Sequence, residues 1–289
     1  MSYDLIIGDY AHSSWSLRGW LLFENFGIAR RDVMVSFSSD EGVAAQLKDY
    51  APARTVPTIK TPEGAIVNES LAIAEELATR HPDAGLWPNE SLARATARAL
   101  AAEMAAGFTA LRSECPMGLR TAYNWSSPSE DVRSDLARIE EIWAHARAVC
   151  KPDGPWLCGE FSAADAFFAP VAARIAGFSL PVGPDAQAYV DAHLADPAFR
   201  RWRAMGLVHG ETLPWYAQDH PQVPWPGPAP LEAQATERKE SENDTCPYSG
   251  GPVTDFLQLD GRVFGFCNPF CRDKTVADPE AWPAFMALL

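Results

Sequence analysis

The stretch that decides the fold is His12-Ser13-Ser14-Trp15-Ser16-Leu17-Arg18. It follows the short apolar run Leu5-Ile6-Ile7 and opens a helical pattern that continues to Phe26. A serine at a helix start accepts a bond from a free first-turn N–H, and such an end also attracts anions. Ser13 and Ser14 are therefore candidates either for a simple helix cap or for an anion-binding site.

Two later stretches extend this pattern. In Arg54-Thr55-Val56-Pro57-Thr58-Ile59-Lys60 a proline directly precedes a β-type run, and an X-Pro bond can be cis at modest cost. The segment Gly64–Leu77 then indicates a strand, an acidic turn and an amphipathic helix. With strands expected at 3–8 and 32–35 and a short helix at 42–49, residues 1–80 predict an α/β thioredoxin-like domain.

Residues 12–77 resemble the N-terminal domain of cytosolic glutathione S-transferases. The serine-bearing helix start, the Val56-Pro57 pair before a strand and the helix start Glu69-Ser70-Leu71-Ala72-Ile73 all match, and the Ser-Ser-x-Ser-x-Arg run is most similar to the zeta class. The resemblance implies that glutathione is the co-substrate and that Ser13, or Ser14 beside it, activates its thiol. It also implies that Val56 offers main-chain bonds before a cis-Pro57, and that Glu69 and Ser70 hold the γ-glutamyl end.

The resemblance has a departure at Trp15, where zeta-like sequences carry cysteine. A tryptophan there narrows the pocket, which weakens maleylacetoacetate isomerisation as the specific activity more than it weakens glutathione binding. Arg18, outside the apolar arc of the first helix, and also Lys48 and Arg54 are conceivable partners for the glycine carboxylate, with a solvated surface position as the alternative. The resemblance further implies a homodimer and an electrophile pocket between the domains, with the candidates Met104, Phe108, Arg112, Tyr123 and Trp125.

The composition limits the partners and the compartment. The chain has 289 residues, 47% of them apolar, and a formal net charge of −14. This length suits two or three domains, and the negative charge argues against nucleic acid or an anionic membrane as a partner. No apolar run approaches the ~20 residues of a membrane span, and no signal peptide is indicated. Six cysteines without an export signal predict reduced thiols and a cytoplasmic location.

After a linker at 81–90, residues 91–216 predict an all-helical domain. An alanine-rich helix is expected over 91–112 and an amphipathic helix over 130–150. Ser162 and Asp165 stand three apart, as in a capping box, at the start of a helix that Pro170 should kink. Three scattered cysteines are expected to be buried in this domain: Cys115, Cys150 and Cys158.

The stretch 217–244 is rich in proline and charge and predicts a partly extended linker. Residues 245–289 then predict a small cysteine-bearing α+β module, with a strand at 262–266. Cys246, Cys267 and Cys271 are similar in placement to the cysteines of TRASH/YHS-type metal modules. That resemblance implies a three-thiolate site for zinc with water, or for a soft ion such as Cu(I). Because Ser249 replaces an expected fourth cysteine, the alternative is a metal-free module held by aromatic packing.

Three functional hypotheses follow from these patterns. The leading one is a glutathione transferase that activates the thiol of glutathione, by a serine at a helix N-terminus, for attack on a small electrophile. The first rival is a glutathione-dependent cis–trans isomerase of the maleylacetoacetate type. The second is a non-catalytic transferase-fold protein that binds ligands or senses metal.

Overall fold

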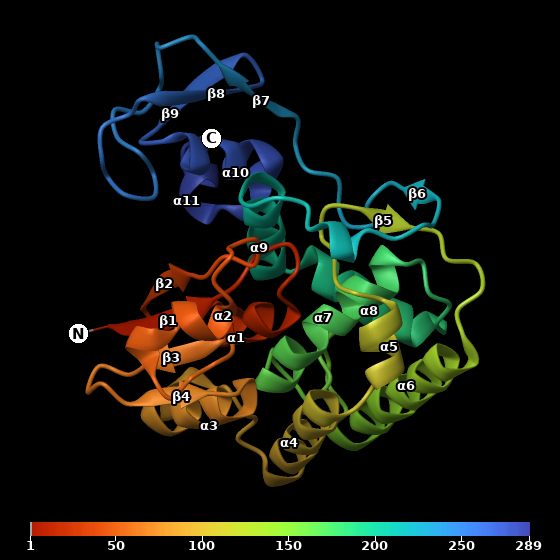
Figure 1. The fold of residues 1–289 in the computed structure, drawn as a ribbon. Coiled ribbons are helices and arrows are strands. Elements are labelled where there is room, and N and C mark those ends of the chain that lie inside the picture. Colours follow the sequence, from red (N-terminus) through yellow and green to blue (C-terminus); the bar gives the residue numbers. More distant parts are fainter. Residues whose placement is uncertain (1) are drawn as a thin grey trace.

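The computed structural model describes residues 2–289 (Figure 1). In chain order it has an α/β domain, a helical domain beside it and a small C-terminal module that lies against helix α9 (Pro197–Val208). The α/β and all-helical parts have the architecture expected from the sequence. Within the described residues, no helix is both long and apolar enough to cross a bilayer.

The α/β domain contains a four-stranded sheet with the order β2-β1-β3-β4. Strand β1 runs parallel to β2 and antiparallel to β3, and β3 pairs antiparallel with β4. Leu5 and Ile7 face a core shared with α1 and α3, while Ile6 packs with Leu47 on the opposite face, so both faces are covered. The elements are β1 (Tyr3–Ile7), α1 (Ser14–Glu24), β2 (Arg30–Met34), α2 (Val43–Gln46), η1 (Lys48–Tyr50), β3 (Thr58–Lys60), β4 (Ile66–Asn68) and α3 (Ser70–Arg80).

The helical domain is built around α7 (Ala163–Gly177), every residue of which is buried. At its start the Asp165 carboxylate accepts hydrogen bonds from the backbone N–H and hydroxyl of Ser162, each at 2.9 Å, so the predicted cap is present. Cys115 and Cys158 are buried, and Cys150 is half-buried. The other elements are η2 (Pro82–Ala84), α4 (Ser91–Ala106), α5 (Thr109–Glu114), α6 (Glu130–Cys150), α8 (Pro184–Ala195), α9 and η3 (Pro214–Tyr216).

The helix expected over 91–112 is broken in the structure. Helix α4 ends at Ala106, Gly107 caps it, and Phe108 adopts a left-handed conformation with φ 57° before α5 begins. Glycine has low helix propensity and favours helix ends, and the turn at Phe108 buries its ring. The prediction of one continuous helix is therefore wrong, and α4 and α5 are separate helices.

Parts of the stretch 217–244, predicted as a linker, are paired as strands. Strand β6 (Gln222–Val223) pairs with β5 (Ala122–Tyr123) of the helical domain. Strand β7 (Ala233–Thr236) joins the antiparallel sheet of the module, in the order β7-β8-β9. The module consists of this sheet with β8 (Asp255–Leu259) and β9 (Arg262–Phe266), followed by α10 (Pro269–Ala277), η4 (Pro279–Ala281) and α11 (Pro283–Met286).

The module is docked on the helical domain through α9. The guanidinium of Arg200 donates to both carboxylate oxygens of Asp278, at 2.8 and 2.7 Å, and both side chains are mostly buried. Arg201 donates to the carbonyl of Ala281 at 3.0 Å and also bonds Glu24 of α1 at 3.0 Å. Arg201 thus joins the module to the α/β domain through α9.

Candidate active site

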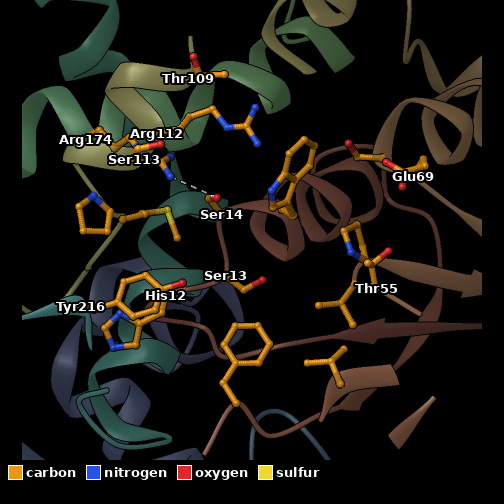
Figure 2. A pocket seen from close by; sticks show the side chains of 18 of the residues that line it. His12, Ser13, Ser14, Thr55, Glu69, Thr109, Arg112, Ser113, Arg174 and Tyr216 are labelled. Atoms are coloured by element: carbon orange, nitrogen blue, oxygen red, sulfur yellow. Dashed lines mark hydrogen bonds between the residues drawn. The ribbon is translucent and has the colours of Figure 1, made fainter. Parts of the chain in front are cut away.

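A cavity of about 690 Å³ lies between the α/β domain and the helical domain. Figure 2 shows the serines of the α1 start in its centre, with Thr55 and Glu69 on one side and Arg112 and Arg174 on the other. The six residues that the sequence assigned to glutathione and its thiol all line this cavity: Ser13, Ser14, Val56, Pro57, Glu69 and Ser70.

The start of α1 is organised by a serine network. Ser13 is the N-cap, and its buried Oγ accepts a bond from the Ser16 N–H at 3.3 Å. The Ser13 hydroxyl donates to the Ser16 Oγ at 2.8 Å, and that oxygen also accepts from the Gly8 N–H at 2.9 Å. Ser14 is half-buried, and its Oγ accepts from Arg174 at 3.4 Å, which leaves the Ser14 proton free to donate.

The loop before β3 (residues 51–57, the proline loop) approaches α1 at a glycine. The Val56–Pro57 peptide bond is cis, as the sequence suggested, and a second cis bond joins Ala51 to Pro52. A Cβ atom built on Gly19 of α1 meets the Cβ of Pro57 at 2.6 Å, closer than side chains pack. Gly19 therefore lets the Pro57 ring lie directly on α1, which fixes Val56 beside the serines.

The turn into α3 combines backbone strain with an unpaired hydroxyl. Glu69 has φ 68° and ψ 121°, a conformation that non-glycine residues rarely adopt. The next residue, Ser70, is buried, and its Oγ has no hydrogen-bond partner among residues 2–289. Buried polar groups are normally satisfied, and a helix N-terminus favours anions, so this turn is suited to a carboxylate ligand.

The opposite wall of the cavity is cationic. Arg174 of α7 is buried and donates to the Cys115 carbonyl at 2.8 Å and the Pro170 carbonyl at 3.1 Å. Burial lowers the pKa of Arg174 to about 10, which still leaves it charged at neutral pH. Arg112 of α5 and Arg54 of the proline loop also line the cavity. Among the described lining residues, Glu69 is the one acidic side chain. In a protein with net charge −14, this cavity is a local cationic site.

Trp15 lies between two arginines at the edge of the cavity. The Arg18 guanidinium carbon is 4.3 Å from the centroid of the Trp15 ring, and that of Arg112 is 4.8 Å away. Arg18 is 1% exposed and does not line the cavity, so the structure contradicts both roles considered for it. The helical wheel missed its burial because α1 also packs against α7, whose Phe167 ring lies 5.4 Å from Arg18.

Of the five candidates for the electrophile pocket, Arg112 alone lines the cavity within the described chain. Met104 and Phe108 are buried in the core, and Tyr123 and Trp125 pack around Phe178. Lys48 is exposed and does not line the cavity, whereas Arg54 does. The four other candidates lie outside α5, on α4, at the α4–α5 break and in and after β5, and their side chains pack into the helical domain instead.

Several lining residues were not identified from the sequence. Arg174 had a usable signal, since it is a charged residue in the otherwise apolar second half of α7, and a buried charge needs a partner or a function. The others come from separate segments that meet only in the fold: His12, Phe37, Val43, Thr55, Thr109, Ser113, Pro116, Met117 and Tyr216.

The three cysteines of the module also meet in space. The Sγ atoms of Cys246, Cys267 and Cys271 all lie within 4.8 Å of one another. Burial raises the pKa of Cys246, but hydrogen bonds from the backbone N–H groups of Tyr248, Cys267 and Ser249 outweigh it and bring this pKa to about 7. Burial raises the pKa of Cys271 to about 12, although Lys274 acts in the opposite direction.

Comparison with known proteins agrees with this geometry. Residues 12–80 match the family model for the glutathione S-transferase N-terminal domain. A glutathione transferase homologue from Burkholderia, solved with bound glutathione, matches 70% of this chain and 96% of its own, with a TM-score of 0.52 and 22% identity. Ure2p in complex with glutathione matches 70% of this chain and 93% of its own, with a TM-score of 0.54 and 17% identity.

The chain has the glutathione transferase fold. Two relatives bear on its class. A probable maleylacetoacetate isomerase from Caenorhabditis elegans is 35% identical over 100 residues, which are 35% of this transferase-fold chain and 45% of that protein. The maleylacetoacetate isomerase of Pseudomonas aeruginosa is 28% identical over 204 residues, or 66% of this chain and 92% of its own. The family match and these relatives support a glutathione transferase enzyme, and the solved structures agree in fold.

Proposed function

We propose that this protein is a glutathione transferase that activates the thiol of glutathione by a serine at the start of α1. One observation carries the proposal. The α1 start, the Val56–Pro57 loop and the Glu69–Ser70 turn converge on one cavity, although each comes from a different segment. The proposal joins these three features into a single glutathione site.

In the proposed complex glutathione lies along the α/β side of the cavity. Its γ-glutamyl carboxylate accepts bonds from the Ser70 N–H and hydroxyl at the start of α3, where the helix end favours an anion. Its amine pairs with Glu69, and its cysteinyl part bonds the main chain of Val56. Arg54, the basic residue on this side of the cavity, pairs with the glycine carboxylate.

The chemistry follows from the position of the sulfur. A thiol attacks an electrophile as its thiolate, and a hydroxyl donor beside the sulfur stabilises that anion and lowers the pKa of the thiol. We assign this donor role to Ser13 because the family resemblance aligns it with the activating serine; Ser14 is the rival on geometry. Ser13 must turn its proton away from Ser16 to donate, whereas Ser14 already accepts from Arg174 and keeps its own proton free. The thiolate then forms a bond to the electrophile, and the electron pair leaves with its leaving group.

The experiment compares Ser13→Ala and Ser14→Ala with the parent protein, using turnover of an aryl halide and glutathione as a function of pH. Loss of a donor to a thiolate costs about 1.5–3 kcal/mol, roughly ten- to a hundred-fold in rate. Ser13→Ala should raise the pKa seen in the rate profile and leave the fold intact. An effect in Ser14→Ala alone would transfer the role to Ser14. No turnover by the parent, with glutathione bound, would favour a non-catalytic binding protein.

A second candidate is a glutathione-dependent isomerase of the maleylacetoacetate type. Two relatives carry that name, and the cationic wall made by Arg112 and Arg174 favours an electrophile that bears a carboxylate. In this reaction the thiolate adds to the double bond, rotation follows, and glutathione leaves unchanged. A glutathione-dependent cis–trans isomerisation assay, run with Arg112→Gln as the variant, separates this activity from transfer to an aryl halide.

The resemblance also supports a homodimer that works in the cytoplasm. Light scattering coupled to size-exclusion chromatography measures the mass in solution, for comparison with 31.6 kDa for one chain. Imaging of the tagged protein in its own cell tests the compartment. A monomeric mass at micromolar concentration would contradict the dimer.

A further inference from the structure

The three-cysteine cluster of the C-terminal module lies outside the proposed glutathione site, and its argument does not depend on glutathione chemistry. The cysteines come from three different elements. Cys246 precedes β8, Cys267 follows β9, and Cys271 lies in the first turn of α10. Three thiols brought within 4.8 Å of one another from separate elements form a set of ligands for one ion.

The surroundings of the sulfurs are arranged to support anionic thiolates. The Ser249 hydroxyl and the Asn268 side-chain amide each lie 3.2 Å from the Cys267 Sγ and donate to it. Asn268 also accepts from the Cys271 N–H at 2.8 Å, which fixes the start of α10. Such outer hydrogen bonds orient metal ligands and reduce the charge repulsion between them.

One cation faces the cluster and is held in place by aromatic rings. The Lys274 ammonium lies 4.1 Å from the centroid of the Trp282 ring and 4.3 Å from that of Tyr248. It interacts electrostatically with all three cysteines. This fixed positive charge offsets part of the negative charge that three thiolates carry.

The coordination number limits the ion. Among residues 2–289, the group of candidate ligands at this place contains three cysteines and no histidine or carboxylate. Ser249 and Asn268 are exposed and Cys267 is half-buried, so the cluster is open to solvent on that side. Soft thiolates select Cu(I) and Zn²⁺ among common metals, and structural zinc normally takes four protein ligands.

We propose that Cys246, Cys267 and Cys271 bind one soft metal ion through three thiolates. Ser249 lies on the side of this site that is open to solvent. Cu(I) binds with the three sulfurs alone, whereas Zn²⁺ takes a water in the fourth position. Binding releases the thiol protons to solvent and changes no oxidation state. The ion ties the Cys246 turn, the end of β9 and the start of α10 together.

The test uses the reduced full-length protein without air. Cu(I) is offered as its complex with bicinchoninate, and transfer is followed by loss of the colour of that complex; Zn²⁺ is offered in a parallel titration against a chromophoric chelator. One equivalent of either ion should bind the parent protein. Cys267→Ser should abolish binding, whereas Cys150→Ser, which changes a half-buried cysteine outside the cluster, should retain it.

A second variant tests the open position. Ser249→Cys supplies a fourth sulfur and should raise zinc affinity roughly tenfold or more, because it completes a four-thiolate site. The proposal is overturned if the parent binds neither ion, if Cys267→Ser binds as well as the parent, or if Ser249→Cys leaves zinc affinity unchanged. Far-ultraviolet circular dichroism of each variant establishes that it is folded.

Discussion

At the scale of single residues, replacing Ser70 should affect ligand affinity and protein stability in different directions. Its buried hydroxyl has no partner in the described chain, so replacing it by alanine removes an unsatisfied polar group from the ligand-free protein. If a glutathione carboxylate accepts a hydrogen bond from this hydroxyl, Ser70→Ala should weaken the binding free energy by about 1.5–3 kcal/mol, which is roughly ten- to a hundred-fold in Kd. We expect weaker binding by calorimetry and an unchanged or higher melting temperature.

Ser113→Ala is the matched control for Ser70→Ala, because Ser113 lines the same cavity on the opposite wall. Glutathione affinity in this control should equal that of the parent. Equal affinity in Ser70→Ala and the parent would show that the Ser70 hydroxyl does not bind the ligand.

His193 of α8 predicts how stability depends on pH. It is 1% exposed, and burial lowers its pKa from 6.5 to about 3. Between these values the unfolded chain binds a proton that the folded chain does not, so the free energy of unfolding falls as the pH drops through this window. The contribution reaches about 1.4 kcal/mol per pH unit. Urea unfolding from pH 7 to pH 4 should show a shallower decline in His193→Gln; equal slopes would contradict this assignment.

That Ser13, Val56, Pro57, Glu69 and Ser70 line one cavity could be predicted because their signals are local. Each belongs to a short motif at the end of one element that resembles the glutathione S-transferase N-terminal domain, and the order of elements brings those ends together. On the cationic wall, Arg112 was one of the five candidates from the sequence, whereas Arg174 was not identified. Both reach the cavity through the packing of α5 and α7, which no local pattern describes.

At the scale of elements, the contact between α1 and the proline loop determines where Val56 lies. Gly19→Ala introduces a Cβ that meets Pro57 at 2.6 Å, so the helix and the loop must separate. Overpacking of this kind costs about 1–3 kcal/mol of stability, and the displaced loop should also weaken glutathione binding. Thermal unfolding and calorimetric titration measure the two effects.

Gly154→Ala is the control for the helix–loop contact, since an added Cβ there has no atom of the described structure within 4 Å. Its stability and affinity should match those of the parent. If Gly19→Ala also matches the parent, α1 and the proline loop adjust to each other without consequence for the site.

The break between α4 and α5 shows why an element boundary escaped the sequence. The alanine-rich run before it has high helix propensity, and a single glycine inside such a run is often tolerated. What ends α4 is the buried ring of Phe108, which is reached through a left-handed backbone conformation. Tertiary packing thus overrides the local preference, and it delivers Thr109 and Arg112 to the cavity.

At the scale of the whole molecule, the ion pair between Arg200 and Asp278 couples the module to the helical domain. Both side chains are mostly buried, at 16% and 10% exposure, so Asp278→Asn leaves the Arg200 guanidinium with only its longer contact to Glu280, at 3.3 Å, as a charge partner. We expect a loss of about 1–3 kcal/mol in the free energy of unfolding. Denaturant unfolding of Asp278→Asn, Arg200→Gln and the double variant gives the coupling energy; strictly additive losses would contradict a direct interaction.

The composition of 217–244 predicted a partly extended linker, but composition carries no information about strand pairing. Strands β6 and β7 pair with partners about 100 residues earlier and about 20 residues later, and such register depends on the assembled fold. From the linker-like composition of this stretch we also predict that a chain ending near Asp219 stays folded. The contacts of Arg200 and Arg201 with the module indicate that this truncation lowers stability.

The cationic cavity of this acidic protein has a kinetic consequence. Far from the surface, an anionic ligand meets the repulsion of the net charge of −14, and at the cavity mouth it meets the attraction of three arginines. Dissolved salt screens the distant repulsion first, because its screening length is about 8–10 Å near physiological ionic strength. Added salt should therefore speed association of glutathione while also speeding its dissociation. Stopped-flow tryptophan fluorescence, to which Trp15 contributes from the cavity wall, can follow both steps.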